Sequence, residues 1–193
     1  MQPFFTEKLA AERRALFLQQ AQQDRLLKSA QRSSTARLRV RVLEPSDIHR
    51  LADLYDGLSP RSRFLRFMSP IHRVPDSALE HLASIDHDRH EALGAFDRGG
   101  LVASAHWFRP QHNPRWAELA IEVTDHYQRR GVGSRLLRLL GQRARAQGIV
   151  EFGATLLAEN TGAIALLRAT GWPFASMSDG PEIAVAMAIG PQA

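Results

Sequence analysis

The chain has 193 residues, 44% of them hydrophobic and 23% charged, a composition that suits one soluble globular domain with an extension. It contains no cysteine, which excludes disulfide bonds, thiolate zinc sites and a cysteine acyl-enzyme. The net charge of +5 would suit an acidic partner such as a nucleic acid, but only Lys8 and Lys28 are lysines, and a charge made of arginine can equally reflect codon bias.

The sequence predicts neither a membrane segment nor a secretion signal. No apolar run approaches the roughly 18 residues that cross a bilayer. Charged residues, among them Glu7, Lys8 and Glu12, occupy the N-terminus, where a signal peptide would be apolar. We therefore expect a cytoplasmic protein without a membrane partner.

Residues 1–35 form a predicted helical extension in front of a single domain, residues 36–193. Apolar residues recur at roughly helical intervals up to about residue 32, and a Ser-Ser-Thr run then ends the pattern. We expect this helix to pack on the domain or on a second copy of the chain, which would make a homodimer. The alternative is a nucleic-acid or membrane-surface helix, which its three acidic residues disfavour.

The first half of the domain is predicted as one strand followed by three helices. Residues 38–42 alternate between apolar residues and arginine, which indicates a half-buried strand. A Glu-Pro-Ser-Asp turn then caps a helix at 48–58. Pro60 begins a second short helix, and Pro75 introduces a third that runs to about Ile85.

From Glu91 onward the apolar pattern alternates. Residues 92–96 and 101–108 predict a hairpin, and residues 116–123 predict a third strand antiparallel to it. The remaining predicted elements are a glycine-containing loop, a helix to about residue 147 closed by Gly148, a strand at 149–157, a helix capped by Asn160 that ends at Gly171, and a strand at 182–189.

Residues 128–134, QRRGVGS, connect the 116–123 strand to the next helix. Two glycines let the backbone approach a ligand, and the helix start offers unpaired N–H groups and the positive end of a dipole. These features predict a pyrophosphate site. The spacing fits neither a P-loop nor the dinucleotide fingerprint, which needs a third glycine where Leu136 stands.

The loop resembles the Q/R-x-x-G-x-G/A loop of the GNAT superfamily of N-acetyltransferases, which holds the pyrophosphate of acetyl-CoA. AENTGAIALLRATGW, residues 158–172, is similar to a second segment of that family. The resemblance covers about residues 37–189 and implies an α/β (α+β) GNAT fold, with a mixed, mostly antiparallel sheet of six to seven strands flanked by helices. In that fold the strands on either side of the loop splay apart, and the acyl-pantetheine arm lies in the opening.

Two further segments, LSPRSRFLRFMSP at 58–70 and HLASIDHDRHEALGAF at 81–96, resemble the acetyltransferase domain of bacterial Pat-type protein lysine acetyltransferases. The resemblance implies acetyl transfer from acetyl-CoA to a primary amine, with a protein lysine as the first choice. The regulatory domain common in those proteins has no counterpart in the sequence, so a small-molecule amine or an N-terminal amine is the alternative acceptor. An alternative of another class is a non-catalytic acyl-CoA sensor or a basic-arm nucleic-acid binder.

Acetyl transfer requires a neutral amine, whereas a lysine with a pKa of about 10.4 is mostly protonated at neutral pH. A carboxylate on the 116–123 strand can take that proton, and the catalytic candidates are Glu118 and Glu122, four residues apart and therefore on one face. Glu118 matches the catalytic glutamate of the Pat-type A-E-x-A pattern. Glu122 is closer to the expected acyl group, and a bulge in the strand would exchange the two orientations.

The resemblance also implies how acetyl-CoA is held. Backbone groups near Val123 bind the pantetheine arm, loop N–H groups bind the pyrophosphate, and Arg168 reaches the nucleotide phosphates. The expected cofactor-binding residues are Val123, Thr124, Gln128, Arg129, Arg130, Gly131, Val132, Gly133, Ser134, Asn160 and Arg168. The tyrosine with which the family commonly protonates the leaving thiolate is replaced by Leu167, so water is expected to serve.

Three histidines, His81, His87 and His90, lie close in sequence to Asp86 and Asp88. Their spacing matches no recognised metal-ligand pattern. We therefore expect no metal site, and acetyl-CoA is the expected co-substrate.

Overall fold

The structure is a computed structural model that describes residues 19–20, 38–98 and 100–190. The chain divides into two units, residues 1–37 and 38–193. The predicted N-terminal helix and the predicted boundary after residue 35 lie outside the described residues, apart from Gln19 and Gln20, which are helical. None of the described helices is long and apolar enough to cross a membrane.

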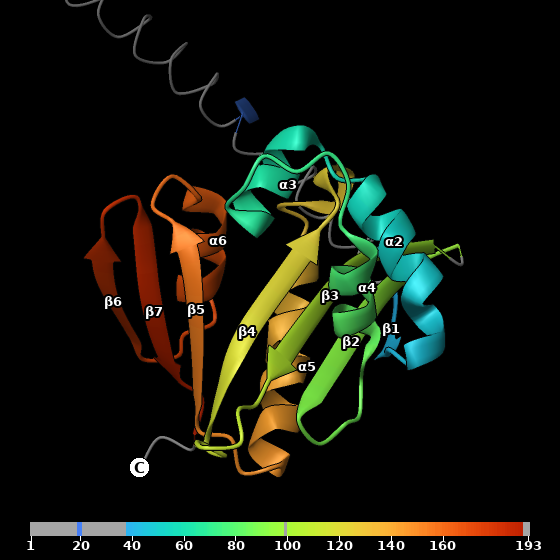
Figure 1. Cartoon of the computed structure of the whole chain (residues 1–193). Helices are drawn as coiled ribbons and strands as arrows, with labels where there is room; N and C mark the ends of the chain where they lie inside the picture. Colours follow the sequence, from blue (N-terminus) through green and yellow to red (C-terminus); the bar gives the residue numbers. More distant parts are fainter. Residues whose placement is uncertain (1–18, 21–37, 99, 191–193) are drawn as a thin grey trace, which may run out of the picture. The chain divides into compact units, whose positions relative to one another are not determined.

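A seven-stranded sheet forms the centre of the second unit, in the order β1-β2-β3-β4-β5-β7-β6 (Figure 1). All neighbouring strands are antiparallel except β4 and β5. The predicted mixed, mostly antiparallel sheet is therefore confirmed. The strands are β1 (Arg39–Val42), β2 (His90–Asp97), β3 (Gly100–Phe108), β4 (Trp116–Val123), β5 (Glu151–Leu157), β6 (Phe174–Asp179) and β7 (Glu182–Ala188).

Helices flank the sheet, as the sequence predicts. Ser59 and Asn160 cap α3 and α6, since their side chains accept hydrogen bonds from the backbone N–H groups of Ser62 and Ala163. The helices are α2 (Ile48–Asp56), α3 (Pro60–Phe67), α4 (Asp76–Ala83), α5 (Val132–Ala146) and α6 (Thr161–Arg168), with short 3-10 helices η1 (Pro45–Asp47) and η2 (Asp125–Tyr127).

Two hydrophobic clusters lie on opposite faces of the sheet. The first joins apolar residues of α5, such as Leu136 and Leu140, to Leu93 of β2. The second joins Leu51 of α2 and other residues of α2 and α4 to Ala92, the neighbour of Leu93 on β2. Because side chains alternate along a strand, neighbouring residues of β2 enter different clusters. Each fully buried leucine contributes about 1.5–3 kcal/mol relative to an exposed one.

Strands β4 and β5 separate part-way along their length. They are paired only from Trp116 to Glu118 on β4 and from Glu151 to Gly153 on β5, and their ribbons diverge beyond that point (Figure 1). The register between β3 and β4 is continuous from Ala103 to Phe108, so β4 has no bulge there. The expected splay is present, and Glu118 and Glu122 point to the same face.

Among the described strands, β6 is the one that the sequence pattern does not predict. Five of its six residues are exposed, and they are small or polar apart from Met177. The strand lies at the sheet edge and pairs only with β7. A strand without a buried face lacks the apolar alternation on which the prediction depends.

Candidate active site

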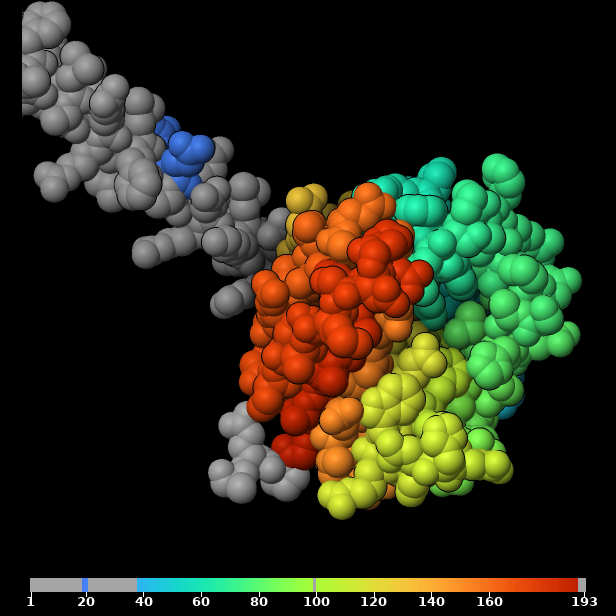
Figure 2. Space-filling model, turned by 60° about the vertical axis from the view of Figure 1, so that its left-hand side comes forward, coloured from blue at the N-terminus to red at the C-terminus, as the bar shows by residue number. Residues whose placement is uncertain are grey.

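A pocket of about 1400 Å³ lies where β4 and β5 part. Its walls come from α3, β4, the loop before α5, β5 and the start of α6. Figure 2 shows the face of the molecule where these segments meet. The orange and red C-terminal segments lie on one side, and the teal and green segments that include α3 and α4 lie on the other. Segments far apart in the sequence therefore share one cavity.

The glycine loop forms one end of the pocket. Gly131 has a φ of 82° and precedes α5 as its N-cap, a left-handed conformation that favours glycine. Gly133 lies against α6, where an added Cβ would be 2.9 Å from Cδ2 of Leu166. The first turn of α5 carries N–H groups without helical partners, and the helix dipole is positive there. The loop can therefore bind an anion such as a pyrophosphate.

Most, but not all, of the expected cofactor residues reach the pocket. The residues that line it are Val123, Gln128, Arg129, Gly131, Gly133, Ser134 and Asn160. The other four, Thr124, Arg130, Val132 and Arg168, do not line it. Thr124 Oγ1 donates a hydrogen bond to the Val102 carbonyl, Val132 is buried, and the Arg168 guanidinium lies over the Phe174 ring.

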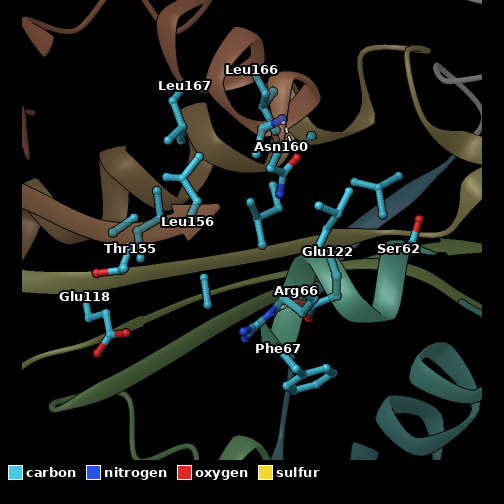
Figure 3. A pocket seen from close by; sticks show the side chains of 18 of the residues that line it. Ser62, Arg66, Phe67, Glu118, Glu122, Thr155, Leu156, Asn160, Leu166 and Leu167 are labelled. Atoms are coloured by element: carbon cyan, nitrogen blue, oxygen red, sulfur yellow. Dashed lines mark hydrogen bonds and ion pairs between the residues drawn. The ribbon is translucent and has the colours of Figure 1, made fainter. Parts of the chain in front are cut away.

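Glu122 is buried in the pocket wall with its oxygens already bound. Arg66 Nε donates to Oε2 at 2.9 Å, and the Tyr55 hydroxyl donates to Oε1 at 2.8 Å. Ser104 Oγ donates to the same Oε1. Figure 3 shows Glu122 beside Arg66, with Asn160, Leu166 and Leu167 on the other side of the pocket. The side chain of Glu122 is only 2% exposed.

The surroundings of Glu122 keep it ionised. Burial on its own would raise the pKa of this carboxyl, but Arg66, His106 and Ser104 lower it to about 2. Burial also raises the pKa of the Tyr55 phenol well above its ordinary value, so this hydroxyl stays a donor. An anion with such partners is a weak base at neutral pH.

Two histidines extend the Glu122 network across the sheet. His106 Nε2 lies 3.0 Å from Ser104 Oγ and 3.5 Å from Glu122 Oε1. His106 Nδ1 lies 3.0 Å from His90 Nε2, and His90 Nδ1 lies 3.1 Å from the Ser84 carbonyl. Because a carbonyl only accepts, His90 Nδ1 carries a hydrogen. Burial and the neighbouring His106 lower the pKa of His90 to about 4, so it is neutral at pH 7.

Glu118 differs from Glu122 although both residues line the pocket from the same face of β4. Glu118 is exposed. Among the described residues, none forms a hydrogen bond or ion pair with its carboxylate. It lies opposite Gly153 in the register with β5, and Thr155 lies two residues further along β5. Glu118 therefore has an open side toward the cavity (Figure 3).

The histidines and aspartates near residue 86 have other partners. Asp86 Oδ1 accepts three backbone N–H groups, from Asp88, Arg89 and His90. His87 lies 3.0 Å from Glu91. No group of three His, Asp or Glu side chains in the described part of the chain is arranged to hold a metal ion.

The family is decided by a direct match. The model of the acetyltransferase (GNAT) family matches residues 51–172. The chain belongs to this family. The GNAT match includes β4, the glycine loop and α6, so it covers the elements that surround the pocket.

Relatives of this GNAT chain include Pat-type proteins. It is 32% identical over 125 residues to the acetyltransferase Pat of Mycolicibacterium smegmatis, a match that covers 63% of this chain and 37% of that protein. The chain thus spans little more than a third of that relative's length. The GNAT domain of Streptomyces lividans PAT, whose crystal structure is solved, superposes with a TM-score of 0.73 at 26% identity, covering 78% of this chain and 90% of that one.

A more distant structure shares the fold. A putative acetyltransferase from Salmonella typhimurium, solved with its cofactor acetyl-CoA, superposes with a TM-score of 0.65 at 16% identity. The match covers 81% of this chain and 96% of that one. At this identity the likeness concerns the arrangement of helices and strands.

Leu167 stands where the family's tyrosine is expected. Leu167 lines the pocket, and its side chain is buried in the first hydrophobic cluster. The hydroxyls of the two tyrosines of the chain already donate to carboxylates, Tyr55 to Glu122 and Tyr127 to Asp97. The side chains that surround Leu167 therefore include no free tyrosine hydroxyl.

The sequence interpretation missed the partners of Glu122. Arg66 and Tyr55 stand in helical apolar patterns and give no sign of a polar site. Ser104 and His106 do give a signal, because they are polar at alternate positions of a strand that is otherwise apolar. Two polar residues on one buried face predict a polar partner across the sheet, and that partner is Glu122.

Proposed function

We propose that the protein is an acetyl-CoA-dependent N-acetyltransferase that acts on a primary amine, with a protein lysine as acceptor and Glu118 as general base. The contrast between the two glutamates of β4 carries this proposal. Glu118 is exposed in the cavity without a described partner, whereas Glu122 is buried and bound by Arg66, Tyr55 and Ser104. Of the two glutamates, only Glu118 has a carboxylate that is exposed to an incoming ammonium and has no described hydrogen-bond donor.

The donor side of the reaction is assigned to the glycine loop. The fit is supported by the left-handed Gly131, the close contact of Gly133 with α6, and the unpaired N–H groups of the first turn of α5. Acetyl-CoA supplies the acetyl group as a thioester. We expect the loop to bind its pyrophosphate and the separated edge of β4 near Val123 to bind its pantetheine arm.

Glu118 then prepares the acceptor. Its carboxylate takes a proton from the ammonium, directly or through a water, and leaves the amine nitrogen with a free electron pair for attack. Glu122 has a different role, since its bonds with Arg66 and Tyr55 hold α3 and α2 against β4. The proton for the departing thiolate comes from water, because Leu167 offers none.

The acceptor assignment is supported by the similarity to Pat of Mycolicibacterium smegmatis and to the GNAT domain of Streptomyces lividans PAT. A small amine or an N-terminal amine is the alternative. The experiment measures thiol release from acetyl-CoA with a panel of acceptors. The panel contains lysine-containing proteins, lysine peptides with a blocked N-terminus, lysine-free peptides with a free N-terminus, and polyamines. The acceptor that supports saturable release identifies the class.

Glu118→Gln is the matched variant for this assay. It keeps the shape of the side chain but cannot take a proton, so we expect turnover to fall by about a hundredfold or more. The Kd for acetyl-CoA should stay within about twofold, because the glycine loop is unchanged. Turnover close to that of the wild type would exclude Glu118 as the base.

A further inference from the structure

Trp116 is a large aromatic residue outside both hydrophobic clusters. It is the first residue of β4, half-buried, and it lines the pocket. Neither cluster includes it, and no described aromatic ring or cation stacks on it. Its indole therefore has a free surface, which is unusual for a side chain that normally contributes to a core.

Gly153 leaves room for the indole. A Cβ built on Gly153 would lie 2.4 Å from Cζ2 of Trp116 and 2.8 Å from both Cε2 and Nε1. Such distances are far below van der Waals contact, so any other residue at this position would displace the ring. The ring therefore lies across β5 at the one point where that strand has no side chain.

The same register brings Glu118 beside the ring. Gly153 pairs with Glu118, and Glu151 pairs with Trp116. Trp116 and Glu118 are two residues apart on β4, so they share one face of the strand. This is also the last stretch over which β4 and β5 are paired. The ring and the carboxylate thus stand together at the point where the cavity opens between the strands.

An indole next to a carboxylate suits a primary ammonium on an unbranched alkyl stem. The ring face is electron-rich and attracts a cation, and its apolar area packs against methylene groups. The carboxylate attracts the same charge and then takes its proton. An α-amine has no such stem, because its nitrogen is attached directly to the branched backbone carbon.

We propose that Trp116, held over Gly153, is the acceptor-selecting wall of the site and favours the side-chain amine of lysine over an α-amine. This inference rests on the proposed acetyl transfer with Glu118 as base. It assigns acceptor specificity to an aromatic side chain, while Glu118 performs the chemistry.

Binding can be tested without turnover. The probe is n-butylammonium, titrated into the full chain while the indole N–H resonances of its three tryptophans are recorded by NMR. Trp116→Phe assigns the Trp116 resonance by its loss. We expect this resonance to shift saturably with n-butylammonium and much less with 1-butanol, which has the same stem without the charge. A resonance that does not move overturns the proposal.

Kinetics supply the second test. Trp116→Leu and Gly153→Ala should each raise the KM for a lysine peptide by roughly tenfold, the size expected for a lost cation–π contact. The KM for acetyl-CoA should not change. Trp116→Phe should recover most of the loss, because it keeps an aromatic face. Gly190→Ala is the matched control, since its new methyl group would come no closer than 3.5 Å to any atom.

The two proposals fail in different ways. If the wild type releases no thiol with any amine, the proposed function fails, and the NMR titration still decides whether the ring binds an alkylammonium. If Glu118→Gln abolishes turnover while Trp116→Leu and Gly153→Ala leave the lysine-peptide KM unchanged, the function stands and the Trp116 assignment is wrong.

Discussion

Arg66 and Glu122 form an ion pair inside the pocket wall, with Nε 2.9 Å from Oε2. The pair joins α3 to β4, and its side chains are 22% and 2% exposed. Burial disfavours the charged guanidinium, but Tyr55 and Glu122 more than offset this and raise the pKa of Arg66 above its ordinary value. The strand that carries Glu118 is therefore fixed to a helix that lines the same cavity.

Removing one partner of the Arg66–Glu122 ion pair should lower the free energy of unfolding. We expect Arg66→Met to reduce the free energy of unfolding by on the order of 3 kcal/mol, because it leaves a buried carboxylate without its cation. The double variant Arg66→Met, Glu122→Gln should cost less than the sum of the single changes. Urea denaturation of the three variants measures the coupling, and additivity within about 0.5 kcal/mol would contradict it.

The exposed ion pair between Arg61 and Glu159 is the control for the variants of Arg66 and Glu122. Its atoms are also 2.9 Å apart, but its side chains are 57% and 52% exposed. Because water screens such a pair, Arg61→Gln should change the free energy of unfolding by less than about 1 kcal/mol. The comparison separates the effect of burial from that of distance.

Acid should destabilise the fold partly through Glu122. Its pKa is about 2 in the folded chain, against an ordinary value of 4.5. A lowered folded pKa gives stability that is complete above about pH 4.5 and is lost as the pH falls toward 2. Glu122→Gln should therefore flatten the pH dependence of the free energy of unfolding between pH 5 and 3, measured by urea denaturation.

Part of the acid dependence should remain in that variant. The hydrogen bond from Arg41 lowers the pKa of Asp47 to about 2, so this carboxylate titrates over the same range with the same sign. An unchanged slope in Glu122→Gln would show that Glu122 is not held as an ion in the folded state.

The left-handed Gly131 should matter for the cofactor. Gly131→Ala places a side chain at a φ of 82°, which costs roughly 1–2 kcal/mol and distorts the loop before α5. We expect the Kd for coenzyme A, measured by calorimetry, to rise by about tenfold or more. Gly148→Ala is the control, because Gly148 has a φ of 81° and follows the other end of α5. Equal affinities in the two variants would argue against the loop as the binding site.

Asp125 connects α3 to the segment before the glycine loop. Its carboxylate accepts hydrogen bonds from the Ser59 N–H at 3.0 Å, the Ser59 hydroxyl at 2.9 Å and the Ser62 hydroxyl at 2.7 Å. Asp125→Ala should lower stability by about 1–2 kcal/mol and also raise the KM for acetyl-CoA, because the loop loses its support. Asp76→Ala, at the exposed start of α4, should change neither the stability nor the KM for acetyl-CoA. If Asp76→Ala changed both to the same extent, the effect of Asp125→Ala would come from the loss of a negative charge in general.

The elements were largely predictable because most of them bury one face. Strand β4 has the predicted bounds, and Asn160 is the predicted cap of α6. The local pattern was sufficient there, since it records which side chains face a core. The edge strand β6 lacks such a face and was not predicted. The helical extension and the homodimer through it concern residues 1–35 and stay predictions.

The sequence by itself determined the family, the glycine loop and the two candidate glutamates, since each depends on residues that are neighbours in the chain. The Pat-type pattern pointed to Glu118, but only the tertiary structure showed how the surroundings of Glu118 and Glu122 differ. Both lie on one face of β4, but Arg66 from α3 and Ser104 from β3 surround Glu122, while Glu118 lies opposite a glycine. Burial and partners come from segments distant in sequence, and they decide whether a carboxylate is an ion-pair partner or an available base.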